Sequence, residues 1–279
     1  MNNSRTLFLL AACFLNFIKA DEPAHPHLHK EVRIVGYHGP TDKHIFKLFR
    51  GAEILEMIDC NITTSPSELY SNLPRLKKLH LENNTYHDVD YETVMHGAHS
   101  LEEFYFINIK MKRIHIATLG QLPKLRICVI RGLKSPAKTL DANILNGTVL
   151  EEFEFSNNVL ETIDNLAFNG LSKLEKLNLA DNKLKSISKE ALTPLKNLKV
   201  LNLKGNKIEK FSMNDLPELP NLEEINLSEN PVNELKLDSI EKVAPKLRTL
   251  RIVETAISEA QVKELKDKTK TEIIDKGEK

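Results

Sequence analysis

The sequence predicts an α/β solenoid, in which short parallel strands line a concave face and short helical or irregular segments return across a convex face. Three observations support this fold. A pattern of apolar residues recurs every 24 or 25 residues over most of the chain. Two apolar positions in each interval alternate, as on a strand with one buried face. An asparagine follows that strand at a fixed offset in several intervals. Since one such unit cannot bury its apolar face alone, stacked units must share one core.

The first twenty residues have the layout of a secretory signal peptide. Arg5 precedes an apolar run over residues 7–15, and small Ala20 precedes acidic Asp21. Signal peptides combine a basic start, a short apolar core and a small residue at the cleavage site. A membrane anchor is the alternative, but this run is shorter than the ~20 apolar residues that a span needs. We therefore expect residues 1–20 to be removed, secretion to the extracellular space, and no membrane anchor.

Residues 21–51 are expected to cap the N-terminal end of the core. Val32 and Ile34 form one further, degenerate strand, and the segment KHIFKLFRG at 43–51 follows it. The same region places three histidines at alternate positions in HPHLH, residues 25–29. Such a cluster can bind a transition metal. Because no carboxylate stands nearby at a strong motif spacing, we interpret this segment as a histidine-rich leader and expect no metal and no cofactor.

Residues 52–257 carry about nine repeats. In the clearest copy, residues 174–187 read LEKLNLADNKLKSI, with leucine or isoleucine at places 1, 4, 6, 11 and 14 and asparagine at place 9. Places 4 and 6 point to one face of a strand, and places 11 and 14 turn the chain back over the same interior. Place 6 recurs at Met57, Leu81, Phe106, Ile130, Phe155, Leu179, Leu203, Leu227 and Ile252.

The asparagine at place 9 stands where the chain leaves the strand and turns its backbone groups toward the interior. A carboxamide both donates and accepts hydrogen bonds, so it can satisfy groups that would otherwise be buried unpaired. The residues are Asn84, Asn158, Asn182, Asn206 and Asn230.

This LxxLxLxxNxL pattern resembles the leucine-rich repeat family over roughly residues 32–257, and the FxGL element at residues 168–171 strengthens the likeness. The resemblance implies a right-handed solenoid (horseshoe) with a parallel sheet on its concave face. The chain is most similar to small secreted leucine-rich repeat proteins of insects, including the mosquito leucine-rich immune proteins, which implies a role in innate immunity. Those immune proteins form dimers through cysteines and a coiled coil after the repeats. This chain has neither there, so the resemblance does not carry a dimer over.

Residues 258–279 are expected to close the C-terminal end. Ser258 and Gln261 have capping-box spacing. They open an amphipathic helix whose Val262 and Leu265 can cover the last repeat. The segment 269–279 is expected to be a frayed, charged tail.

Two cysteines, Cys60 and Cys128, follow the expected cleavage site. A disulfide is the first interpretation in a secreted chain. The repeat register favours free thiols, because it sets the two residues three strands, or ~14 Å, apart. A disulfide needs Cα atoms within about 7 Å.

Charge and motifs exclude several classes of function. Lys plus Arg equals Asp plus Glu, at 39 each, which gives no global reason to bind nucleic acid or an anionic membrane. We find no Gly-rich phosphate loop, zinc-protease motif or nucleophile elbow. Paired glutamates recur at places 2 and 3 of the repeat, as a solvated rim does, so we do not expect an enzyme.

Four Asn-x-Ser/Thr sequons predict an extracellular glycoprotein. They begin at Asn61, Asn83, Asn146 and Asn226. An unused sequon is the alternative at each position. Asn226 occupies place 5, so a sugar there would stand on the concave face.

Places 2, 3, 5, 7 and 8 are expected to point to the concave face and to vary freely. Polar residues fill place 5 in the C-terminal half, but apolar and aromatic side chains gather in the N-terminal half. Exposed patches of this kind are typical of protein-binding sites, although scattered apolar residues are the simpler interpretation. The predicted patch consists of Ile54, Tyr105, Ile107, Ile127, Val129 and Arg131. We therefore expect an extracellular protein-binding module. A matrix-type structural protein and an inhibitor of a secreted enzyme are the alternatives.

Overall fold

The computed structural model describes residues 18–19, 30–41, 46–65, 69–87, 97–111, 116–133 and 138–277. The chain forms two compact units, one of residues 1–125 with 132–135 and one of residues 126–131 with 136–279. The boundary falls inside the segment 52–257, which the sequence presents as one run of repeats. Each unit is described by itself.

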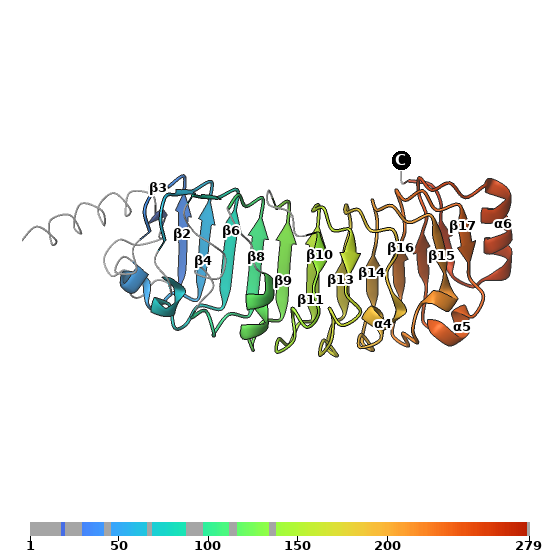
Figure 1. Cartoon of the computed structure of the whole chain (residues 1–279), viewed down its shortest axis with the longest axis horizontal. Helices are drawn as coiled ribbons and strands as arrows, with labels where there is room; N and C mark the ends of the chain where they lie inside the picture. The colour runs from blue at the N-terminus through green and yellow to red at the C-terminus, as the bar shows by residue number, and fades with distance from the viewer. Residues whose placement is uncertain are drawn as a thin grey trace, which may run out of the picture. The chain divides into compact units, whose positions relative to one another are not determined.

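The first unit is built on a sheet whose strands follow one another along the chain (Figure 1). Its order is β1 (Ile18–Lys19), β2 (Glu31–Val35), β4 (Ile54–Ile58), β6 (Lys78–Glu82) and β8 (Glu103–Ile107). Strands β2 to β8 are parallel and in register, so that Leu55 pairs with Leu79 and Leu79 with Phe104. On the return side lie the short strands β3 (His38–Gly39), β5 (Asn61–Ile62) and β7 (Thr85–Tyr86), and the 3-10 turns η2 (Lys47–Phe49), η3 (Leu69–Asn72) and η4 (Ile116–Gln121).

The described part of the segment 21–51 contributes buried residues to the N-terminal end of the core. Val32 and Ile34 of β2 are buried, as are Phe46 and Phe49 around η2. Strand β1 pairs antiparallel with β2 and covers its outer edge. The two residues of β1 belong to the predicted signal peptide. The rest of that segment and the histidines at 25–29 lie outside the described residues.

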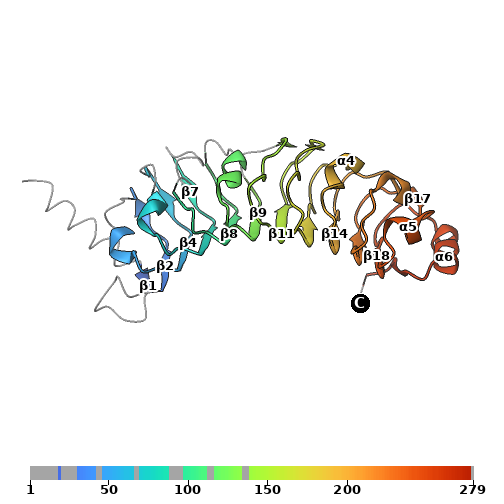
Figure 2. The same ribbon diagram turned by 90° about the horizontal axis from the view of Figure 1, so that it is seen from below.

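The second unit continues the same architecture. Its parallel sheet has the order β9 (Ile127–Arg131), β11 (Glu152–Ser156), β13 (Lys176–Asn178), β14 (Val200–Asn202), β16 (Glu224–Asn226), β18 (Thr249–Arg251) and β19 (Glu272–Ile274). The return segments lie opposite this sheet (Figure 2). They contain β10 (Thr139–Leu140), β12 (Thr162–Ile163), β15 (Lys210–Ser212), β17 (Glu234–Lys236), η5 (Met213–Asp215), α4 (Lys189–Leu192) and α5 (Ile240–Val243); helix α6 (Glu259–Lys268) follows them.

The repeat pattern is confirmed in both units. All nine residues at place 6 are at most 2% exposed. The asparagines at place 9 bond as expected. Asn182 Nδ2 donates to the Phe155 carbonyl (2.7 Å), and its Oδ1 accepts from the Leu160 N–H (3.0 Å). Asn206 and Asn230 make the equivalent bonds to their own neighbours. Asn84 Nδ2 likewise donates to the Met57 carbonyl, but its Oδ1 accepts from the Cys60 N–H, two places earlier in the preceding repeat.

The expectation that place 8 varies freely is wrong. This place has a left-handed backbone, with positive φ, in every repeat from β2 to β18. Glycine, asparagine and aspartate adopt this conformation at the least steric cost, which explains why they predominate there. At Gly205 a Cβ would lie 2.2 Å from Asp181 Oδ1 of the preceding repeat. The residues are Gly36, Asp59, Asn83, Asn108, Gly132, Asn157, Asp181, Gly205, Glu229 and Glu254.

The C-terminal helix is confirmed, but the frayed tail is wrong. Ser258 and Gln261 form the capping box of α6. The following chain then returns to the sheet as β19, which pairs in parallel with β18. Ile273 is 6% exposed and stands beside Leu250 in the register. The Thr271 hydroxyl donates to the Leu247 carbonyl (3.1 Å). Since Ile273 occupies the core position of a repeat, the tail adds one last strand.

Candidate functional site

The open face of each sheet, opposite its return segments, is the surface that the repeats leave available. In β4, β6 and β8 the side chains alternate between buried and half-buried, and the half-buried ones form this face. Each strand contributes its first, third and fifth residue. On β6 and β8 these are Lys78, His80, Glu82, Glu103, Tyr105 and Ile107.

Tyr105 is held in place by its neighbours on this face. Lys78 Nζ lies 5.0 Å from the centre of its ring, as in a cation–π pair. The His80 ring lies 5.5 Å away, tilted by 41°. The Tyr105 hydroxyl donates to Glu103 Oε2 at 3.3 Å. We call Lys78, His80, Glu103 and Tyr105 the Tyr105 cluster.

Carboxylates flank the imidazole of His80 on both sides. Nδ1 lies 3.8 Å from Glu56 Oε1 on β4, and Nε2 lies 3.2 Å from Glu82 Oε2 on its own strand. Glu56 also lies 3.5 Å from Arg33 on β2. The open face of β2 to β8 therefore carries four acidic residues and two basic ones. Its net charge is minus two when histidine is counted as neutral. The residues are Glu31, Glu56, Glu82 and Glu103 against Arg33 and Lys78.

Three members of the predicted patch lie on this face of the first unit. Ile54, Tyr105 and Ile107 are each half-buried. Ile54 pairs with Lys78 across β4 and β6, and Tyr105 pairs with His80 across β6 and β8. The cationic and imidazole side chains of β6 thus separate the isoleucine of β4 from the tyrosine of β8. Tyr105 could be identified from the sequence, whereas the partners that orient it could not.

The other three members lie in the second unit, where one prediction is wrong. Val129 is only 5% exposed and is not a surface residue. It pairs with Glu154 of β11, which is itself buried. Arg131 reaches across to Glu154 (2.6 Å). Ile127 is half-buried, and Arg131 is exposed but ion-paired.

A column of asparagines continues the open face of the second unit. The Oδ1 atoms of Asn178, Asn202 and Asn226 each accept from the backbone N–H two residues later, at 3.1, 3.1 and 3.0 Å. These bonds fix the orientation of the amides. One signal in the sequence pointed to this column, namely the same residue at place 5 of three successive repeats.

The four sequons differ in their surroundings. Asn83 and Asn146 are exposed, whereas Asn61 and Asn226 are half-buried. Asn61 Oδ1 lies 2.6 Å from His87 Nε2. Asn83 Nδ2 donates to Asp59 Oδ1 at 3.1 Å, within the ladder of place-8 side chains.

Cys60 and Cys128 are free and buried, as expected from the register. Burial raises the pKa of both thiols, so each stays protonated near neutral pH. In the part of the chain that the structure describes, no group of three or more His, Cys, Asp or Glu is placed to hold a metal ion. The same part has no helix of sufficient length and apolarity to cross a membrane.

Comparison with known proteins supports the fold. Residues 172–232 match the leucine-rich repeat family model. No curated protein matches the sequence. Among solved structures, the chain is similar to TLR13 in its complex with ssRNA13, with a TM-score of 0.62, 17% identity, and 88% of this chain and 43% of that one covered.

Two further structures show the same likeness. One is a chain in the octameric complex of Latrophilin 3, Unc5D and FLRT2, with a TM-score of 0.65, 13% identity, and 93% of this chain and 91% of that chain covered. The other is the Toll–Spätzle complex of Drosophila development and innate immunity, with a TM-score of 0.54, 15% identity, and 88% and 41% covered. The chain spans less than half the length of the TLR13 and Toll chains that it matches. At these identities the likeness shows the fold alone. The repeat architecture and the match over residues 172–232 agree on the leucine-rich repeat fold.

Proposed function

We propose that the protein is an extracellular recognition module of innate immunity, and that it binds a protein partner on the open face of its first unit. The observation that carries this proposal is the Tyr105 cluster. Tyrosine is among the residues that most often anchor interfaces. Lys78 and His80 already hold its ring, so binding would cost less side-chain entropy than it does for a free side chain.

The charge of this face suggests the chemistry of the partner. The open face of β2 to β8 carries two more acidic than basic residues. Complementary charge speeds association and excludes partners of the wrong sign. We therefore propose a partner that presents basic side chains around an apolar contact, and we expect its association to slow as salt is raised.

Several findings favour binding over catalysis. Leucine-rich repeat proteins generally act as binding modules, and the three similar structures named above are each described in a complex. A matrix-type or inhibitory protein would also work by binding. The identity of the captured partner would distinguish these alternatives from a role in immunity.

Secretion and glycosylation complete the proposal. We infer that residues 1–20 are removed on export, and that sugars are attached at Asn61, Asn83, Asn146 and Asn226. A sugar on Asn226 would stand on the open face of the second unit.

The experiment compares partner capture from native extracellular fluid by the wild-type protein and by Tyr105→Ala. Loss of a tyrosine anchor should weaken affinity by ~2 kcal/mol or more, about thirtyfold. The melting temperature should change little, because Tyr105 is only half-buried. Asn178→Ala, on the open face of the second unit, is the matched control and should bind normally. Unchanged affinity in Tyr105→Ala would contradict the proposed face.

A further inference from the structure

The ladder of short strands on the return side of the second unit stops at β17. This strand pairs in parallel with β15, and the two form a sheet of their own. One repeat of 25 residues after Glu234–Lys236, the next strand (rung) of this ladder would be expected at residues 259–261. Those residues instead form the first turn of α6, after the Ser258–Gln261 capping box. The chain therefore turns into a helix where the repeat would supply a strand.

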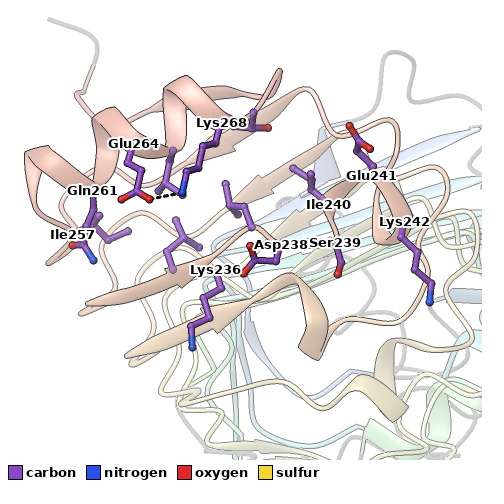
Figure 3. Close-up of a pocket in the computed structure, with 14 residues that line it drawn as sticks. Lys236, Asp238, Ser239, Ile240, Glu241, Lys242, Ile257, Gln261, Glu264 and Lys268 are labelled. Carbon is purple, nitrogen blue, oxygen red and sulfur yellow. Dashed lines mark hydrogen bonds and ion pairs between the residues drawn. The ribbon is translucent and has the colours of Figure 1, made fainter.

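A groove of about 740 Å³ lies beside β17, bounded by α5 and α6 (Figure 3). It is lined by half-buried aliphatic side chains from all of these segments and from the loops between them. They are Leu235, Leu237, Ile240, Ile257 and Leu265. Their exposed area is the apolar surface that a further rung would cover.

The charges at the rim of the groove balance. Three basic side chains, Lys236, Lys242 and Lys268, face three acidic ones, Asp238, Glu241 and Glu264. Lys236 is paired with Glu234 at 2.6 Å, and Lys268 with Glu264 at 2.5 Å. The rim therefore gives no reason to select a strongly charged ligand. Aliphatic side chains and backbone groups carry the selectivity.

We propose that this groove binds an extended segment of a partner protein, which pairs in parallel with β17 and continues the β15–β17 ladder. Alternate N–H and C=O groups of an edge strand point away from its one partner and can bond to an added strand. The added segment carries aliphatic side chains at positions i and i+2, to match Leu235 and Leu237. This site is separate from the open face and does not depend on the function proposed above.

A free segment suits the groove better than a second copy of the protein. In a second copy, β17 is itself flanked by α6, so the helix would block its approach. Two copies related by a twofold axis would also pair β17 antiparallel, whereas β15 and β17 are parallel.

The test selects random peptides of about twelve residues, displayed on phage, against the full-length protein. Counter-selection uses the Leu265→Glu variant, which places a charge in the groove. We expect enriched peptides with aliphatic residues at i and i+2. Their affinity should fall more than about tenfold in Leu265→Glu and in Leu237→Glu, since a charge would be buried against apolar groups. Leu166→Glu is the matched control, because Leu166 is exposed in another repeat of the same unit, and binding should be unchanged.

Two measurements on the wild-type protein do not depend on how the variants fold. Bound peptide should slow amide hydrogen exchange at residues 234–237. N-methylation of the peptide amides that face β17 should weaken binding by about tenfold, whereas methylation of the alternate amides should not. The proposal is overturned if no peptide is enriched, or if neither set of N-methylated amides changes the affinity of the peptide. It is also overturned if sedimentation shows a dimer that Leu265→Glu dissolves, since the occupant would then be a second copy.

Discussion

Replacing Asn182 with alanine tests whether the place-9 asparagines hold the repeats together. The side chain makes four hydrogen bonds, but alanine does not orphan all of their backbone partners. The Leu179 carbonyl still accepts from Asn206 Nδ2, and the Ala180 carbonyl still accepts from the Asn157 N–H.

Two partners of Asn182 lose the bond that the side chain supplied. They are the Leu160 N–H and the Phe155 carbonyl, both on buried residues. An unsatisfied buried backbone group costs roughly 1–3 kcal/mol. The free energy of unfolding should therefore fall by about 2–6 kcal/mol.

The assay is urea unfolding followed by circular dichroism, with the midpoint and the slope fitted together. Asn202→Ala is the matched control, because that half-exposed side chain accepts one bond, from the Lys204 N–H. It should cost about 1 kcal/mol or less. Equal losses in the two variants would refute the reasoning, since burial would then not distinguish place 9 from place 5.

Three further predictions concern single side chains. Native protein should resist thiol reagents at Cys60 and Cys128, whereas unfolded protein should react at both without prior reduction; a mass gain in the native state would contradict their burial. Gly205→Ala should lower the melting temperature, because its φ is +66° and the new Cβ would meet a carboxylate oxygen at 2.2 Å; an unchanged melt would contradict the close approach. Hydrogen bonds from Lys236 and a second lysine lower the pKa of Glu234 to about 2. The stabilisation of the fold by this ionised carboxylate is small and screened by salt. It should be complete above pH 4.5 and should fade as the pH falls toward 2. A carboxyl NMR titration midpoint that stays near 2 in Lys236→Ala would contradict this cause.

The repeat period and the core positions could be predicted because each repeat carries the same apolar pattern. A strand with one buried face requires apolar residues at alternate positions, so Leu177 and Leu179 were identifiable without coordinates. The asparagine at place 9 was identifiable for a similar reason, since a carboxamide serves buried donors and acceptors together.

Features that depend on neighbouring strands were harder to predict. Val129 has the register of a surface residue, yet it is buried beside Glu154, to which Arg131 is ion-paired. The orientation of Tyr105 depends on Lys78 and on His80, which stand about 25 residues earlier in the chain. Sequence spacing shows which face a side chain takes, but not how far its neighbours extend over it.

The bonds of Asn182 have a consequence for synthesis on the ribosome. The Leu160 N–H lies one repeat earlier and has no partner until residue 182 has emerged. Asn206 stands in the same relation to Leu184, and Asn230 to Ile208. A nascent repeat therefore cannot complete its own turn, and we expect folding to follow translation at a lag of one repeat. A chain stalled between Leu160 and Asn182 should leave its last repeat open to proteases, and extension past Asn182, 22 residues after Leu160, should close it.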